Sequence, residues 1–332
     1  MMSRRSYGKS GLKITPMGLG LAALGRPGYI NLGHAQDLQQ NYLVPSMEAQ
    51  AHTVLDAAWS SGIRYFDAAR SYGRAEQFLA SWLGKNDISH ESVTVGSKWG
   101  YTYTADWQVE VSVHEVKDHS LPVLQRQIRE SRDLLGGYLD LYQIHSATLE
   151  SGVLDDPELL SELARLREGG LAIGLSLSGP NQPATLYKAL EIEFDGCLLF
   201  SSVQATWNLL ETSAGPALFA AQEAGLGIMI KEALANGRLT SRNEDSHFKE
   251  KYLLLAQVAA ENETTMDAIA LAFVLAQPWV DMVLSGATAV DQLRSNLAAL
   301  TINLDESDVA DLARMVEEPA DYWQTRSQLA WN

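Results

Sequence analysis

Short apolar runs recur along the chain, and each is followed by a loop and by a segment with helical spacing of its apolar residues. Strands that alternate with helices in this way predict a parallel sheet. The expected strands are 17–22, 63–68, 93–98, 139–145, 172–178, 202–206, 227–232 and 282–287. The expected helices are 47–61, 74–84, 121–136, 156–169, 182–192, 214–224, 264–277 and 289–300.

Eight strand–helix units predict an α/β fold, a closed (β/α)8 TIM barrel with its site at the carboxyl ends of the strands. Residues 5–14 alternate around a glycine turn and predict an N-terminal β-hairpin. Two long stretches, 26–46 and 99–120, follow the first and third strands, so we expect both to overhang the C-terminal face. Asp305 is expected to open the final helix. No linker interrupts the pattern, and 1–332 is predicted to be a single domain.

Composition narrows the classes of function. The formal net charge of −16 argues against nucleic acid and anionic membranes as partners, because both require basic surface. No run approaches the about 20 apolar residues of a membrane span, and the start does not resemble a signal peptide, so a cytoplasmic location is expected. The single cysteine, Cys197, is expected in the core. The histidines lack metal-ligand spacing, so no metal is expected.

Four polar residues lie at or just after the ends of three successive strands: Asp67, Tyr72, Lys98 and His145. A lysine inside a barrel mouth needs a carboxylate partner, and Asp67 is the natural one. We expect the Lys98 ammonium to lower the pKa of the Tyr72 phenol, and His145 to orient a substrate oxygen. These groups can protonate a carbonyl oxygen, but none of them supplies a hydride, so a cofactor is expected.

The segments YFDAARSYG, TVGSKWG, LDLYQIHS, IGLSLSG, SVQATWNLL, KEALANGRL and SGATAVDQLRSNL carry a resemblance to the aldo-keto reductases over essentially the whole chain. Asp67, Tyr72, Lys98 and His145 match that family's catalytic tetrad in order and spacing. The resemblance implies an NAD(P)H-dependent oxidoreductase that reduces an aldehyde, ketone or sugar to an alcohol, or catalyses the reverse. Tyr72 would be its general acid/base.

The resemblance also implies where NADP(H) or NAD(H) would lie. It places Gly20, Leu21, Ser176 and Gln204 around the nicotinamide, Ala233 and Leu234 over the pyrophosphate, and Gly286, Thr288, Gln292 and Asn296 at the adenosine end. Lys231 stands where many members stack an aromatic ring on the nicotinamide; it can pair with pyrophosphate or substrate, or simply pack at the strand end. Leu177 replaces a common asparagine. Thr288 and Gln292 stand where members that select the 2′-phosphate often have Arg or Lys, so the preference between the cofactors stays open.

Aromatic residues of the long loops are the candidate substrate wall: Tyr29, Trp99 and Trp107, with Trp207 after the sixth strand. Tyr101, Tyr103, Asn31 and His114 are further candidates, and Trp323 and Trp331 can fold over the mouth or pack on a partner. The partner expected is a small carbonyl or alcohol; the oligomeric state is not indicated. Two alternatives remain, a cofactor-binding regulatory subunit with little turnover and an isomerase or lyase using Lys98 as a Schiff-base amine.

Overall fold

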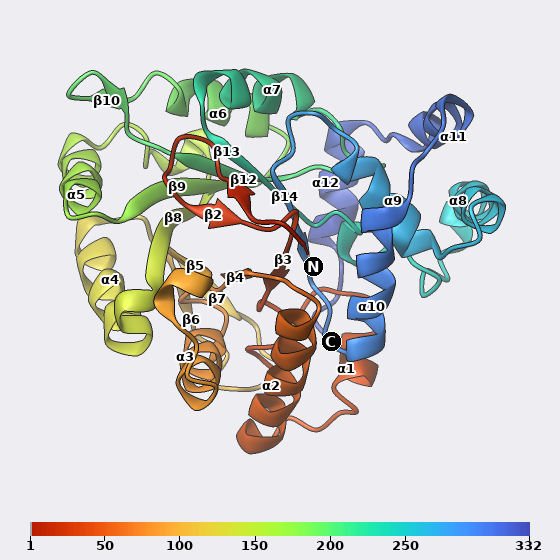
Figure 1. Ribbon diagram of the computed structural model, residues 1–332, viewed down its shortest axis with the longest axis horizontal. Helices are drawn as coiled ribbons and strands as arrows, with labels where there is room; N and C mark the ends of the chain where they lie inside the picture. Colours follow the sequence, from red (N-terminus) through yellow and green to blue (C-terminus); the bar gives the residue numbers. More distant parts are fainter. Residues whose placement is uncertain (1) are drawn as a thin grey trace.

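A computed structural model describes residues 2–332, and in it eight parallel strands close into a barrel (Figure 1). The order around the barrel is β12, β13, β14, β3, β4, β5, β8 and β9. The predicted TIM barrel is therefore confirmed. The strands are β3 (Met17–Gly20), β4 (Tyr65–Asp67), β5 (Thr94–Trp99), β8 (Leu139–Ala147), β9 (Ala172–Leu177), β12 (Ser202–Thr206), β13 (Gly227–Lys231) and β14 (Met282–Ser285).

Helices surround the barrel, and each of the eight predicted helices is present with ends shifted by a few residues (Figure 1). They are α2 (Val44–Ser60), α3 (Ala75–Lys85), α4 (Leu121–Leu135), α5 (Pro157–Glu168), α6 (Gln182–Ala189), α7 (Gly215–Ala224), α9 (Met266–Leu275) and α10 (Val290–Ala298). Within residues 2–332, no helix is long and apolar enough to span a membrane.

Three further helices were not predicted, α1 (His34–Asp37), α8 (Lys249–Glu261) and α12 (Pro319–Ser327), whereas α11 (Glu306–Leu312) is the helix expected after Asp305. Asp305 opens α11 as expected, but it does not open the final helix. Its carboxylate accepts a hydrogen bond from the Asp308 backbone N–H at 2.9 Å and caps α11, after which the chain continues into α12. The cap was recognisable from the sequence, but the second helix behind it was not.

Three antiparallel hairpins lie outside the barrel sheet. β1 (Arg5–Ser6) and β2 (Lys13–Ile14) form the predicted N-terminal hairpin, which crosses the near end of the barrel in Figure 1. The stretch after β5 folds into a second hairpin of β6 (Tyr101–Tyr103) and β7 (Glu115–Lys117). β10 (Glu193–Phe194) and β11 (Cys197–Leu198) form the third.

The third hairpin corrects the placement of Cys197, which is exposed and not a core residue. Asp195 and Gly196 have φ angles of 54° and 72°, and two successive residues in this region make the tight turn that Asp-Gly favours. The turn folds the apolar run CLLF back on the surface, so its first residue faces solvent while Leu199 and Phe200 enter the core.

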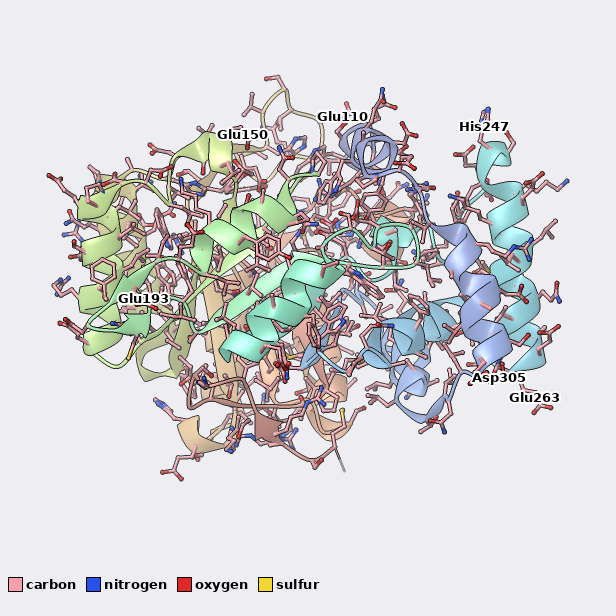
Figure 2. All side chains as sticks on the ribbon, turned by 90° about the horizontal axis from the view of Figure 1, so that it is seen from above. Glu110, Glu150, Glu193, His247, Glu263 and Asp305 are labelled. Atoms are coloured by element: carbon pink, nitrogen blue, oxygen red, sulfur yellow. The ribbon has the colours of Figure 1, made fainter. Side chains whose placement is uncertain are left out.

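The two ends of the barrel differ in what covers them. A small apolar cluster closes the end beneath the N-terminal hairpin, and includes Tyr7, Tyr65, Leu141 and Met282. At the other end lie the loops that follow the strands. Figure 2 shows Glu110 and Glu150, from the loops after β5 and β8, at the same upper edge of the molecule, whereas Glu193 and Asp305 lie at its sides.

Candidate active site

Three neighbouring strand ends bring the predicted tetrad together. Asp67 ends β4, Lys98 lies near the end of β5, and His145 lies in the last part of β8. The Lys98 ammonium pairs with the Asp67 carboxylate and donates to the Ala68 carbonyl at 3.0 Å. Its Nζ lies 3.4 Å from the Tyr72 Oη, which in turn lies 3.5 Å from the His145 Nε2. One phenol therefore sits between an ammonium and an imidazole.

The Tyr72 ring reaches this position through a turn after β4. The Tyr72 backbone N–H donates to the Ala69 carbonyl at 3.1 Å, and Arg74 N–H donates to the Gly25 carbonyl at 2.7 Å. A Cβ on Gly25 would collide with the Tyr72 carbonyl oxygen, so glycine is required where the two segments meet. The loop after β3 thereby fixes the turn that carries the phenol.

The Asp67 carboxylate is held on its other oxygen by three neutral donors. Tyr65 Oη, Gln143 Nε2 and Gln204 Nε2 lie 3.3, 3.4 and 3.2 Å from Asp67 Oδ1. Asp67 and Lys98 are both buried, at 2% and 0% exposed. A buried ion pair with its remaining lone pairs satisfied is rigid, and it keeps the Lys98 charge at a fixed distance from Tyr72.

The expected lowering of the Tyr72 pKa is wrong. Burial raises the pKa of Tyr72 well above its usual value, and the negative charge of Asp67 adds to that rise. Burial also holds the pKa of His145 well below its usual value, assisted by the charges of Lys98 and Lys231. The sequence argument counted the ammonium but not the burial. The site therefore holds a protonated phenol beside a neutral imidazole.

A cavity of about 780 Å³ opens above the tetrad and extends to helices α8, α9 and α10. Asp67, Tyr72 and His145 line one end of it, and Lys98 lies beneath them without reaching the surface. Most residues that the resemblance assigned to a cofactor also line it: Gly20, Gln204, Lys231, Ala233, Leu234, Gly286, Thr288, Gln292 and Asn296. Within residues 2–332 no cluster of three His, Cys, Asp or Glu side chains has the geometry of a metal site.

Residues 16–317 match the model of the aldo/keto reductase family. This chain belongs to that family. It is 25% identical to the NADH-specific methylglyoxal reductase of Escherichia coli, over 95% of this chain and 99% of the relative. It is also 25% identical to pyridoxal 4-dehydrogenase of Microbacterium luteolum, over 89% and 92%. The aldo-keto reductase AKR11C1 of Bacillus halodurans has the same fold, with a TM-score of 0.74 and 21% identity over 96% of this chain and 99% of that one.

Two of the expected cofactor positions do not line the cavity of this aldo/keto reductase. Leu21 is wholly buried in the core. The Ser176 hydroxyl is also buried, and it accepts a hydrogen bond from the Ser146 N–H at 2.8 Å. Ser146 has a φ of 53°, so Ser176 holds an unusual bend that follows His145. Ser176 therefore acts on the site through the backbone of Ser146.

Three of the four residues expected to contact the substrate do not line the cavity either. Trp99 has no exposed surface and packs against His119, Trp107 packs edge-on against Phe78, and Trp207 stacks on Phe273. Only Tyr29 lines the cavity. The loop after β5 folds into the hairpin β6–β7. Most aromatic side chains of this loop pack against other residues of the protein.

The wall at the tetrad end is instead charged. Arg26, which is 3% exposed, pairs with Glu115 at 2.8 Å and lies 5.2 Å from the centre of the Tyr72 ring. Trp331 closes this side, stacked 3.9 Å from His114 with Arg26 4.8 Å from its ring centre. Asn31 lines the cavity as well, whereas Trp323 packs against Tyr322 away from it. No sequence motif identified Arg26 or Glu115, because their roles arise from a contact between two loops.

A second charged group surrounds Lys231. Its Nζ donates to the Thr206 hydroxyl at 2.8 Å and lies 3.7 Å from Glu232 Oε1. Glu232 is held from the other side by both nitrogens of Arg326 in α12, at 2.8 and 2.5 Å. Burial alone would raise the pKa of Glu232, but Arg326 and Lys231 lower it to about 2. All three charges face the cavity, and only Lys231 was expected there.

Proposed function

We propose that this protein is an NAD(P)H-dependent oxidoreductase that reduces the carbonyl group of a small molecule to an alcohol, or catalyses the reverse. NAD(P)H-dependent carbonyl reduction is the general reaction of the aldo/keto reductase family. One observation carries the proposal for this chain. The Tyr72 Oη lies within 3.5 Å of both the Lys98 ammonium and the His145 imidazole, on the surface of a cavity large enough for a cofactor and a substrate.

Tyr72 is the proposed proton donor. Its raised pKa keeps the phenol protonated at neutral pH. The alkoxide formed when a carbonyl accepts a hydride is a stronger base than a phenolate, so the proton moves downhill from Tyr72 to the substrate oxygen. The Lys98 ammonium, 3.4 Å away, stabilises the phenolate that remains. The ion pair with Asp67 holds this ammonium in place.

His145 is proposed to position the substrate oxygen. The Ser71 hydroxyl lies 3.5 Å from its Nδ1, and a hydrogen bond donated there leaves the ring proton on Nε2. That nitrogen lies beside the Tyr72 Oη, so the imidazole and the phenol can donate to the same oxygen. Because the His145 pKa is lowered, this role uses a neutral ring and does not require protonation at pH 7.

The residues of the cavity suit a dinucleotide. A Cβ at Gly286 would meet no atom within 4 Å, so the backbone there is open to close approach by a ligand. Gln204, Ala233, Leu234 and Asn296 would hold the cofactor between the tetrad and α10. When bound, the reduced nicotinamide supplies the hydride. Lys98 is enclosed by Asp67 and the Ala68 carbonyl with no exposed surface, which disfavours the Schiff-base alternative.

The charged wall favours a small, polar substrate. Arg26, Glu115, Lys231, Glu232 and Arg326 surround the tetrad end, and a large apolar ketone would remove water from these charged pairs without hydrogen-bonding to them. Tyr29 and Trp331 add aromatic faces against which a short carbon chain or a sugar ring can lie. The names of two relatives, a methylglyoxal reductase and a pyridoxal 4-dehydrogenase, are consistent with substrates of this size and polarity.

The test is direct. The protein is titrated with NADH and NADPH by fluorescence, and oxidation of the reduced nicotinamide is then followed with methylglyoxal, glyoxylate, pyridoxal and a set of aldoses. Saturable binding followed by oxidation with at least one substrate is expected. Tyr72→Phe is expected to lower kcat by about 10²–10⁴ and to leave the cofactor Kd within about twofold, since it removes the acid alone.

Two results would contradict the proposal. Binding without turnover across the set would favour the regulatory alternative. A Tyr72→Phe variant with nearly normal kcat would show that another group gives the proton. Phe219→Tyr is a matched control, because Phe219 is half exposed on α7, far from the tetrad in the sequence and absent from the cavity wall.

A further inference from the structure

A carboxylate lines the cavity where the loop after β3 meets the segment after β14. Asp37, the last residue of α1, lines the cavity there with 11% of its side chain exposed. Its Oδ2 accepts a hydrogen bond from the Thr288 hydroxyl at 3.0 Å, and Thr288 also lies 3.2 Å from Gln292 Oε1. Asp37 reaches this position because the loop after β3 crosses over to α10.

The proposed function decides which part of a dinucleotide lies here. Hydride transfer places the nicotinamide beside Tyr72, so the other nucleoside extends toward α8, α9 and α10, where Thr288, Gln292 and Asn296 line the wall. Asp37 therefore faces the adenosine half. The inference rests on the proposed function for this orientation and for nothing else.

The charges at this end are mainly negative. Among residues 2–332, the ionisable side chains that line it are Asp37, Asp267, Asp291 and Arg242, three carboxylates and one guanidinium. Asp291 is exposed and lies 3.3 Å from Arg294, so it is screened. Asp37, in contrast, is held in place by hydrogen bonds from Arg242 and Thr288. Burial alone would raise its pKa, but hydrogen bonds from Arg242, Gln292 and Thr288 hold the pKa below its usual value, so it is ionised at neutral pH.

We propose that Asp37 makes this protein select NADH over NADPH. A ribose with free hydroxyls can donate a hydrogen bond to the carboxylate. A 2′-phosphate has no such donor, and to gain a cation here it would have to take Arg242 away from Asp37. Thr288 and Gln292 are neutral and supply no other cation for it.

Arg242 is the one cation that lines this end within the described residues, and its contacts decide its role. Its two terminal nitrogens donate to the two Asp37 oxygens at 2.8 and 2.5 Å, and one of them also donates to the Gly33 carbonyl at 3.3 Å. A bidentate guanidinium of this kind is already satisfied by the protein. To bind a phosphate it would have to leave Asp37 unpaired.

The experiment measures binding, which does not depend on turnover. The full chain, Asp37→Asn and Arg242→Met are titrated with NADH and NADPH at one low ionic strength, and ADP and 2′,5′-ADP are used as competitors. The unmodified protein is expected to bind NADH about tenfold or more tightly than NADPH. Asp37→Asn keeps the shape and a hydrogen-bonding group, and is expected to reduce that ratio about tenfold, chiefly by tighter binding of NADPH and 2′,5′-ADP.

Asp291→Asn is the matched control, because it removes an exposed carboxylate from the same end and is expected to change the ratio by less than about twofold. Equal or tighter binding of NADPH by the unmodified protein would overturn the inference. So would an Asp37→Asn variant that binds both cofactors less tightly by the same factor, which would mean that Asp37 only supports the loop. A selective loss of NADPH binding in Arg242→Met would assign the phosphate to Arg242. Failure to bind either cofactor would refute the proposed function itself.

Discussion

Lys231 is a largely buried ammonium at the end of β13, with 16% of its side chain exposed, and its burial has a cost that can be measured. Burial lowers the pKa of Lys231 from its ordinary 10.5 to about 8, although Glu232 acts in the opposite direction; Arg326 and Lys98 lower the pKa further. A difference of about 2.5 units corresponds to about 3 kcal/mol by which the folded state disfavours the charged form. At pH 7 the side chain is protonated in both the folded and the unfolded chain, so folding carries this whole cost.

Lys231→Met removes the charge and keeps most of the length of the side chain. At pH 7 we expect the free energy of unfolding to rise by about 1–3 kcal/mol. The gain is smaller than the full cost because Lys231, after Arg326, also helps to keep the Glu232 carboxylate ionised. The Thr206 hydroxyl that loses its donor still has Glu232 Oε2 as an acceptor at 3.3 Å.

The dependence on pH gives the prediction a second, independent signature. The folded-state pKa of Lys231 lies below its unfolded value, so the unfolded chain binds more protons between about pH 8 and pH 10.5. The contribution of Lys231 to stability is therefore unfavourable below pH 8 and fades as the pH rises toward 10.5. The advantage of the methionine variant should shrink over the same range.

Urea unfolding followed by tryptophan fluorescence, at several pH values between about 7 and 10.5, measures both effects. Lys249→Met is the matched control: Lys249 is exposed on α8, and its replacement should change stability by less than about 0.5 kcal/mol. The reasoning is refuted if Lys231→Met is less stable than the unmodified protein at pH 7, or if its advantage does not change between pH 8 and pH 10.5.

Two further predictions concern the wall around Lys231. Glu232→Gln should lower the free energy of unfolding by about 3 kcal/mol at pH 7, because the pKa of Glu232 falls from 4.5 to about 2 on folding. This stabilisation is present above pH 4.5 and is lost as the pH falls toward 2, so the two proteins should converge in acid urea melts; a constant difference would contradict it. Trp331→Ala should raise KM for the carbonyl substrate about tenfold and leave the cofactor Kd within about twofold, since Trp331 packs at the substrate side beside His114 and Arg26. If steady-state and binding assays show that Trp331→Ala raises the substrate KM and the cofactor Kd by the same factor, Trp331 does not lie specifically at the substrate side.

The site residues at strand ends were the ones that the sequence predicted directly. An apolar run followed by a polar residue marks the carboxyl end of a barrel strand, and all such ends face the same way. Asp67, Lys98 and His145 therefore had to meet, whatever the details of packing. Eight of the nine cofactor positions that line the cavity lie at or after such ends, or on α10 after β14, whereas Gln204 lies in the middle of β12.

Residues in long loops were predicted less well, for a physical reason. Tyr29 and Trp99 look equivalent as aromatic residues near strand ends, yet only Tyr29 faces the cavity. The orientation of a loop side chain depends on which other loop it packs against, and that contact has no local signal. Trp99 packs beside His119, from the far end of the same loop.

The pKa values and ion pairs of the site also depended on the tertiary structure. The sequence placed an ammonium near Tyr72 and suggested a lowered pKa, but the extent of burial reversed the direction. Asp37 and Arg242 are 205 residues apart and form a bidentate ion pair. The sequence around neither residue predicts this contact.

The sequence by itself determined the barrel and brought Asp67, Lys98 and His145 to neighbouring strand ends, because both follow from the period of apolar residues and from the common direction of parallel strands. The expected cofactor positions came from the family resemblance. Only the tertiary structure decided which charges face the cavity and in which state they are held. Those properties depend on burial and on pairs such as Arg26 with Glu115 and Asp37 with Arg242, which loops far apart in the chain create when they meet over the barrel.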